Sequence, residues 1–168
     1  MPSTVELQSS IGARDRSAIF GTKRLTLVSC CGAKLGRVAP ARLLYHSPMF
    51  RKSALWAERK GENWFVLSAR HGLVRPDEML EPYDQTLKAM TKAQRDVWAQ
   101  GVVSQLRAWA TDWNVTSLHI TLLAGASYAA WIPLAYDLAR VDQPLAGMSI
   151  GYRLKWLTEQ LTDTVNVP

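Results

Sequence analysis

Three short apolar runs recur along the chain, and each is followed by small residues and then by a helical pattern. The runs are Leu25–Val28, Asn63–Ser68 and Ser117–Leu123. Runs of this kind are typical of strands buried on both faces of a parallel sheet. Strands that alternate with helices predict an α/β fold, here a three-layer α/β/α sandwich with a small, mostly parallel sheet. Because the carboxyl ends of parallel strands meet at one edge, we expect the three turns to lie together.

Two helices have clear start and stop signals. Ser47 suits an N-cap and Pro48 suits the first helical position, so they begin a helix that ends at Gly61. Thr91 and Gln94 form a capping box, which begins a second, longer helix with one apolar stripe rich in tryptophan. Both helices are expected to pack on the sheet.

The remaining segments are less regular. Residues 38–46 predict an extended connection, because a proline lies within them. After the third strand a helical pattern continues through Trp131 and Leu138, although Pro133 must kink or restart it. The last helix begins near Ile150 and follows a glycine-flanked turn, Leu145–Gly151. A short fourth strand is compatible with the segment before that turn.

Length and composition predict one domain with its own core. The chain has 168 residues, of which 48% are hydrophobic, and it contains seven tryptophans. Residues 1–22 are polar and aperiodic, so we expect a flexible basic arm there and a single α/β domain over residues 23–168. Arg14 and Arg16 are compatible with a solvated tail or with an arm that contacts nucleic acid.

Charge and cysteine usage limit the partners and the setting. The net charge of +6 permits an anionic partner, such as a nucleotide, DNA or RNA, without requiring one. No apolar run approaches the roughly 20 residues of a membrane span, so no membrane partner is expected. Cys30 and Cys31 are adjacent, which disfavours a disulfide between them. The sequence contains no Cys-x-x-Cys pair, so a structural zinc site is not expected. We therefore expect a cytoplasmic protein without a metal or other cofactor. The sequence leaves its oligomeric state open.

The first turn, Ser29–Lys34, has the composition of an anion-binding loop. Small residues after a strand leave backbone N–H groups free to face an anion, and Lys34 can reach it. The segment lacks the Gly-Lys-Ser/Thr of a Walker loop, and an ordinary tight turn with a surface lysine explains it equally well. Cys30 is compatible with a small buried hydrophobe, since no local base would generate a thiolate.

The second turn changes from apolar to polar within four residues. Ser68, Arg70 and His71 follow the buried strand, and Gly72 supplies a permissive backbone. His71 is a candidate acid or base, although a loop histidine also serves as a plain hydrogen-bond donor. A core strand alone does not require this mixture, so the turn indicates a site.

A segment with two prolines, Gly72–Asp84, follows the second turn and is predicted to be a long loop. Loops of this length inside compact domains are usually functional. Glu81 and Asp84 flank a fixed Pro-Tyr segment and are the candidates for chemistry. Asp77 and Glu78 are expected to be solvent-exposed turn residues instead.

The third turn, Ala124–Tyr128, again consists of small residues before a helical pattern. Gly125, Ser127 and Tyr128 would hold a ligand next to the first turn if the two turns meet. The same composition is equally compatible with close packing of the turn alone.

The order of these motifs resembles a bacterial and phage domain family of unassigned function. The resemblance covers about residues 24–160 and rests on Ser29-Cys30, Lys34, Ala39-Pro40-Ala41, Leu44-Tyr45, Ser47–Phe50, Leu67-Ser68-Ala69, Gly72-Leu73, Pro76, Glu81–Asp84, Gly125, Tyr128 and Pro144–Gly147. That family is distantly similar to YaaA-type peroxide-stress proteins and to a domain of archaeosine synthase, which modifies deazaguanine in transfer RNA. The resemblance implies a sheet related to that of uracil-DNA glycosylases and a connection with nucleobases or nucleic acid.

Residues and resemblance together lead to one enzymatic hypothesis, hydrolysis or transfer at an N-glycosidic bond of a nucleotide or modified base. Asp84 or Glu81 would stabilise an oxocarbenium-like centre or activate water, and His71 is the third catalytic candidate. The expected binding residues fall into four groups. Ser29, Lys34 and Ser127 would hold phosphate or ribose, Arg70 would steady the leaving base with His71, and Tyr45 or Tyr83 would stack on it. The further candidates for substrate binding are Cys30, Ser68, Gly72, Gly125 and Tyr128.

The alternative hypothesis is a non-catalytic module that binds a nucleotide or nucleic acid. The same pocket would then bind without chemistry, and the basic surface would supply affinity. Binding to a duplex should weaken by about 0.9 log units per phosphate contact for each tenfold rise in salt. Binding of a small nucleotide should depend on salt much less.

Overall fold

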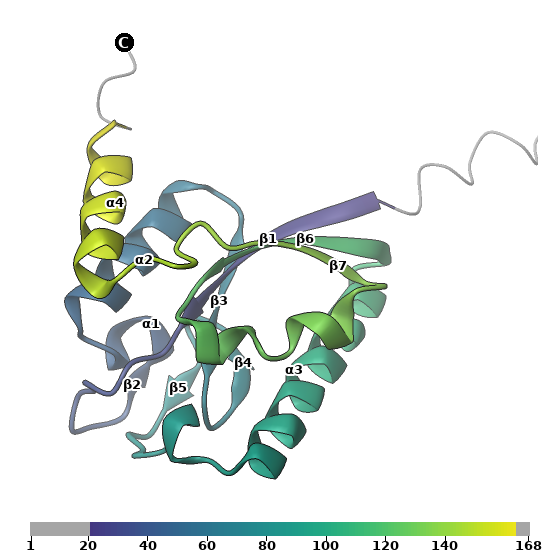
Figure 1. Cartoon of the computed structure of the whole chain (residues 1–168), viewed down its shortest axis with the longest axis horizontal. Coiled ribbons are helices and arrows are strands. Elements are labelled where there is room, and N and C mark those ends of the chain that lie inside the picture. Colours follow the sequence, from purple (N-terminus) through teal and green to yellow (C-terminus); the bar gives the residue numbers. More distant parts are fainter. Residues whose placement is uncertain (1–20, 164–168) are drawn as a thin grey trace, which may run out of the picture.

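The computed structural model describes residues 21–163, which form a five-stranded sheet with helices on both faces (Figure 1). The strand order is β4-β3-β1-β6-β7. The strands are β1 (Gly21–Ser29), β3 (Asn63–Ser68), β4 (Gly72–Val74), β6 (Val115–Leu123) and β7 (Ala139–Asp142). β1 runs parallel to β3 and β6, β7 runs parallel to β6, and β4 is antiparallel to β3 at one edge. The sheet is therefore mostly parallel, as the sequence predicts.

Helices cover both faces of this sheet. α2 (Pro48–Arg59) packs on β1 and on α4 (Ile150–Asp163), whereas α3 (Lys92–Asp112) packs on β4 and β6 from the opposite face (Figure 1). The predicted three-layer α/β/α sandwich is confirmed. Shorter elements link the layers: β2 (Ala39–Pro40), α1 (Ala41–Leu44), β5 (Met79–Leu80), and the 3-10 turns η1 (Leu87–Ala89), η2 (Ala126–Ala129) and η3 (Ile132–Ala135). Within residues 21–163, no helix is long and apolar enough to cross a membrane.

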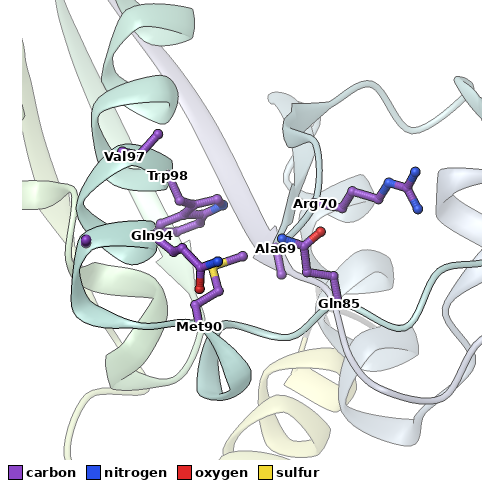
Figure 2. Close-up of a pocket in the computed structure, with 8 residues that line it drawn as sticks. Ala69, Arg70, Gln85, Met90, Gln94, Val97 and Trp98 are labelled. Atoms are coloured by element: carbon purple, nitrogen blue, oxygen red, sulfur yellow. The ribbon is translucent and has the colours of Figure 1, made fainter.

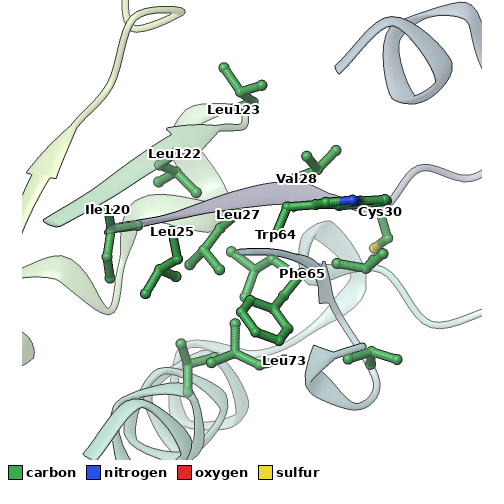
Figure 3. Packing of buried hydrophobic residues seen from close by; sticks show 14 of the residues in the cluster. Leu25, Leu27, Val28, Cys30, Trp64, Phe65, Leu73, Ile120, Leu122 and Leu123 are labelled. Atoms are coloured by element: carbon green, nitrogen blue, oxygen red, sulfur yellow. The ribbon is translucent and has the colours of Figure 1, made fainter. Parts of the chain in front are cut away.

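The core lies on both sides of β1, the central strand. Leu25 and Leu27 point to one side and Val28 to the other, as alternation along a strand requires (Figure 3). On the side of α3, Phe65 packs against Trp109 with ring centroids 4.1 Å apart. Burial on both faces explains why the strands read as continuous apolar runs in the sequence.

The predictions that rest on local signals are confirmed. The second strand has the predicted bounds, Asn63–Ser68. Ser47 caps α2 by accepting a hydrogen bond from Phe50 N, with Pro48 at the first helical position. Thr91 and Gln94 form both bonds of the capping box at the start of α3. Each of these signals acts within a few residues, so no distant contact was needed to predict it.

The prediction that Gly72–Asp84 is a long loop is wrong in part: the segment contains no helix, but it contains two short strands. Gly72–Val74 forms β4, which pairs with the end of β3, and Met79–Leu80 forms β5, which pairs with β2. Gly72 has a φ of +69°, so it permits the sharp reversal from β3 into β4. The strands are two or three residues long, and tertiary pairing rather than periodicity defines them.

The prediction of an α-helix after the third strand is also wrong. The chain makes two 3-10 turns, η2 and η3, and then forms β7 beside β6. Pro133 lies in η3, where a missing N–H is tolerated at a first turn. Trp131 is fully buried between the two turns and anchors the segment. Packing of this one side chain, with the proline, replaces the regular helix.

The boundaries of two other segments differ from expectation. β1 begins at Gly21, so Gly21 and Thr22 pair with β6, whereas the remainder of the expected basic arm lies outside the described residues. The expected extended connection contains the short strand β2 and the helix α1. The amide of Ala41 donates to Glu78 O at 2.9 Å, so this connection is tied to the segment after β4.

Thr26 in β1 gives a test of the core, because its buried hydroxyl has no hydrogen-bond partner among the described residues. Thr26→Val replaces that hydroxyl with a methyl group of nearly the same volume. We expect the free energy of unfolding in urea to rise by about 1 kcal/mol, since burying an unpaired hydroxyl costs roughly this amount. Thr121→Val, at the paired, half-buried position of β6, is the control. Destabilisation by Thr26→Val would show that the hydroxyl is satisfied in solution.

Candidate functional site

A pocket of about 540 Å³ lies where the carboxyl ends of β1 and β6 meet the first turns of α2 and α4. We call it the edge pocket. The turn after β1 contributes Cys30, Cys31 and Gly32; α2 and its N-cap contribute Ser47, Pro48 and Met49; the η1 region contributes Thr86, Leu87 and Lys88; the turn after β6 contributes Ser127 and Tyr128; and α4 contributes Ile150, Arg153 and Leu154. The first and third predicted turns therefore share one pocket, as expected from a parallel sheet.

The edge pocket is electropositive. Its lining includes Lys88 and Arg153 and no carboxylate. Within residues 21–163, neither cation forms an ion pair with Asp or Glu. Met49 lies in the first turn of α2, where backbone N–H groups have no helical partner and the helix dipole favours an anion. The pocket therefore suits a negatively charged group.

A hydrogen bond and the space beside Gly125 together position Arg153. Its Nε donates to Met148 O at 2.8 Å, which fixes the guanidinium at the start of α4. A Cβ placed on Gly125 would lie 3.3 Å from Arg153 Nη1, so the glycine gives the guanidinium room beside the turn after β6. One edge of the guanidinium is thus used for anchoring, and its remaining N–H groups are available to a ligand.

Cys30 and Tyr128 connect the two strand ends at the floor of the pocket. Cys30 Sγ lies 3.1 Å from Tyr128 Oη, and Ala69 N donates to the same sulfur at 3.4 Å. Burial, and then the neighbouring Cys30, raises the pKa of Tyr128. The tyrosine therefore stays protonated at neutral pH and acts as a hydrogen-bonding group rather than a base.

A second group of hydrogen-bonded side chains is centred on Tyr83. Tyr83 Oη is 2.6 Å from Tyr45 Oη and 2.6 Å from Ser68 Oγ. Ser68 Oγ also accepts from the amides of Arg70 and His71, at 3.2 and 3.0 Å. Burial raises the pKa of Tyr45 to about 12 and also raises that of Tyr83. These buried neutral hydroxyls organise the turn after β3.

A smaller pocket of about 370 Å³ adjoins the edge pocket at Gly32, which lines both. We call it the Lys34 pocket. Lys34, Tyr83 and Asp84 line it, and Lys34 Nζ lies 4.4 Å from the centre of the Tyr83 ring. Lys34 is half-buried and Asp84 is exposed, so the carboxylate faces solvent beside the cation.

The structure distributes the sequence-predicted residues over these two pockets. Cys30, Ser127 and Tyr128 line the edge pocket, and Gly125 borders it through Arg153. Lys34, Tyr83 and Asp84 line the Lys34 pocket. Ser29, Glu81 and His71 line neither pocket. Of the three predicted carboxylate and histidine candidates, Asp84 alone therefore lies beside the edge pocket.

Burial excludes direct roles for several predicted binding residues. Tyr45 is 1% exposed and packs against Phe50, so its ring has no face free to stack on a base. Tyr83 is 7% exposed, and its ring lies beneath Lys34 and against His71. Ser68 is fully buried. Their expected contacts with a ligand are corrected to supporting roles, because each polar atom already has a protein partner.

Gly72 supplies the permissive backbone predicted for it, and Arg70 and His71 take part in the structure of the same turn. Gly72 is buried at the β3–β4 reversal, and the side chain of Gln105 lies where a Cβ would be. His71 is exposed, and partial burial of its ring, followed by the charge of Arg70, lowers its pKa. Both Arg70 and His71 use their amides to hold Ser68 Oγ.

Arg153 and Lys88 are the functional candidates that the sequence did not identify. Arg153 lies in the last helix, which the sequence marks by its apolar pattern, and Lys88 lies between the predicted loop and the long helix. Both are separated in sequence from the three turns. A basic residue in the first turn of a helix, where the dipole disfavours cations, was the available signal for Arg153. No local signal marked Lys88.

Within residues 21–163, no group of three His, Cys, Asp or Glu side chains is arranged to hold a metal ion.

Comparisons with known proteins give a family without an assigned activity. Residues 25–159 match the family of unknown function DUF6884. A relative, the uncharacterized protein YfjM of Bacillus subtilis (strain 168), is 34% identical over 71 residues. That match covers 38% of this chain and 47% of the relative, so the chain matches about half the length of YfjM. No solved structure matches the chain.

Proposed function

The chain belongs to the DUF6884 family of unknown function, and we propose that it binds a nucleotide in the edge pocket, with the phosphate near Arg153. The observation that carries this proposal is the lining itself, which includes two cations and no carboxylate. Arg153 is half-buried and has no acidic partner within residues 21–163, so part of its charge is removed from water without a counterion. A ligand anion supplies that counterion.

Phosphate fits the donor groups better than a small carboxylate does. An arginine presents a planar fork that suits phosphate oxygens, and Lys88 adds a mobile positive charge at the rim. The hydroxyls of Ser127 and Thr86 and the backbone N–H of Met49 supply further donors around the same space. Phosphate at a helix N-terminus is a recurrent arrangement in α/β proteins.

The remainder of the pocket suits the sugar and base. Pro48, Met49, Leu87, Ile150 and Leu154 make part of its lining apolar. Its volume of about 540 Å³ lies in the range typical of small-ligand pockets, roughly 300–1,000 Å³. The resemblance to YaaA-type proteins and to the archaeosine synthase domain also favours a nucleobase-containing ligand.

Hydrolysis of the N-glycosidic bond is the reaction that this arrangement favours. Asp84 lines the Lys34 pocket, which meets the edge pocket at Gly32, so a nucleotide that extends past Gly32 would approach its carboxylate. Asp84 would take a proton from water while the water oxygen attacks the anomeric carbon. The carbon–nitrogen bond breaks, and the base leaves with the bonding electrons and takes up a proton from solvent.

Arg153→Met tests the proposed binding. We expect it to weaken binding of a nucleoside monophosphate about 30-fold, because a charge-assisted hydrogen bond contributes roughly 2 kcal/mol. Isothermal titration with nucleoside monophosphates and the matching nucleosides measures the change. Only the monophosphates should lose affinity.

Lys155→Met is the matched control, because Lys155 is exposed on the same helix and does not line the edge pocket. Equal losses in both variants would indicate a general charge effect and contradict the phosphate site. Affinity for an oligonucleotide that exceeds that for the monophosphate and falls steeply with salt would favour the nucleic-acid binding module instead.

A further inference from the structure

A third pocket, of about 420 Å³, lies between α3 and the segments around Ala69 and Gln85. We call it the Trp98 pocket. Figure 2 shows Met90, Gln94 and Trp98 on one side of it and Ala69 and Gln85 on the other. It shares no lining residue with the edge pocket or the Lys34 pocket, and the proposed function makes no use of it.

The walls of the Trp98 pocket are apolar and in part rigid. The indole N–H of Trp98 donates to Ser68 O at 2.9 Å, and the indole meets the ring of Tyr128 edge-on at 5.9 Å. These two contacts fix the indole plane. Met90 is half-buried and Val97 is 68% exposed, so an adaptable thioether and an open aliphatic rim complete the wall. Apolar surfaces of this kind are stabilised when the face of a planar ring covers them.

Two neutral amides lie at the edges of this apolar wall. Gln85 is exposed and has no hydrogen-bond partner in the part of the chain that the structure describes. Gln94 Oε1 accepts from Thr91 N at 2.8 Å, which leaves its Nε2 group with two unused donors. The only charged residue of the lining, Arg70, directs its guanidinium away from the α3 side (Figure 2). The pocket therefore presents neutral donors and acceptors beside apolar surface.

We propose that the Trp98 pocket binds a nucleobase, whose face covers Met90, Val97 and the exposed edge of the largely buried Trp98, and whose edge meets Gln85 and Gln94. A planar heteroaromatic ring with donors and acceptors in its plane matches both features of the pocket. An aliphatic ligand makes no use of the two exposed amides, and an anion has no cation directed at it. A glutamine side chain can pair with N6 and N7 of adenine, so adenine is the test ligand.

This site is structurally connected to the edge pocket. Gln85 directly precedes Thr86, which lines the edge pocket, and the indole of Trp98 contacts Tyr128, which lines it as well. A base in the Trp98 pocket and a nucleotide in the edge pocket would therefore contact neighbouring residues. Free adenine, adenosine monophosphate and a short oligoadenylate distinguish a site for a single base from a site for one nucleotide of a strand.

The experiment is a titration of the whole chain with adenine, followed by the amide and indole N–H signals in heteronuclear NMR. We expect saturable binding that shifts the Trp98 indole signal. Gln85→Met and Gln94→Glu should each weaken it about tenfold, as expected for loss of an edge contact. Gln94→Glu keeps the oxygen that Thr91 N needs, and a negative charge in the first turn of a helix is favourable, so α3 stays capped.

Gln100→Met, an exposed substitution on α3 outside the pocket, is the matched control and should bind adenine as the native chain does. Absence of saturable binding, or binding that both glutamine variants leave unchanged, overturns the proposal. Adenine binding that is lost in Arg153→Met instead places the ring in the edge pocket and also overturns it. Retained adenine binding with no monophosphate binding supports the Trp98 pocket while contradicting the nucleotide site.

Discussion

Ser68→Ala is expected to lower the free energy of unfolding by about 3 kcal/mol, a large part of the 5–15 kcal/mol typical of a domain. The hydroxyl is fully buried at the end of β3 and accepts from the amides of Arg70 and His71. It also bonds Tyr83 Oη at 2.6 Å. Alanine leaves the two backbone donors without their acceptor, each with a desolvation penalty, and removes one of the two hydrogen bonds of Tyr83 Oη, whose bond to Tyr45 Oη remains. Urea unfolding, followed by circular dichroism, measures the loss.

Ser29→Ala is the matched control for this experiment. Ser29 lies at the end of the neighbouring strand, opposite Leu67, and is half-buried. Because its hydroxyl forms no hydrogen bond among residues 21–163, we expect a change within about 0.5 kcal/mol. A loss below 1 kcal/mol for Ser68→Ala would mean that water replaces the hydroxyl, and that the turn after β3 is more open than it is here.

Asp84→Asn is expected to lower the rate of N-glycosidic cleavage at least a hundredfold, because general acid–base groups contribute roughly 10²–10⁴-fold. The substitution keeps the size of the side chain and removes its charge and basicity. Asp84 is exposed, so the melting temperature should not change. Release of free base from the nucleoside monophosphate that binds most tightly is measured by chromatography under single-turnover conditions.

Two further measurements separate this mechanism from the binding proposal. Asp77→Asn removes an exposed carboxylate from the same region, one that pairs with Arg42 at 2.9 Å, and should leave the rate unchanged. Asp84→Asn should also leave monophosphate affinity within about twofold, since Arg153 and Lys88 carry the phosphate contact. Cleavage that persists in Asp84→Asn excludes Asp84 as the base, and binding without any cleavage in the native chain supports the module that only binds.

The hydrogen bonds of Ser68 and Cys30 show how the turns depend on one another. Ser68 Oγ forms a hydrogen bond with Tyr83, which follows β3 in the chain. The amide of Ala69 donates to Cys30, which precedes β3. Cys30 in turn meets Tyr128 from the third turn. The shape of the edge pocket therefore depends on buried groups that touch no ligand, and a substitution among them changes stability and binding together.

The sequence by itself determined the class of the fold and the proximity of the first and third turns. Buried parallel strands read as apolar runs, and caps at Ser47 and Thr91 mark helix starts, because both signals act over a few neighbouring residues. Parallel strands place their carboxyl ends at one edge, so the residues after β1 and β6 had to approach one another.

Only the tertiary structure decided which of those residues line the edge pocket. Tyr45 and Ser68 are polar and lie in the predicted motifs, yet both are buried and paired within the protein. Arg153 is distant in sequence, yet it lies beside Gly125 in the edge pocket. A side chain's partners come from segments many residues away, so burial and charge pairing follow from packing rather than from local pattern. For this reason the sequence indicated the three turns, whereas Arg153, Lys88 and the Trp98 pocket became evident only from the packing of the folded chain.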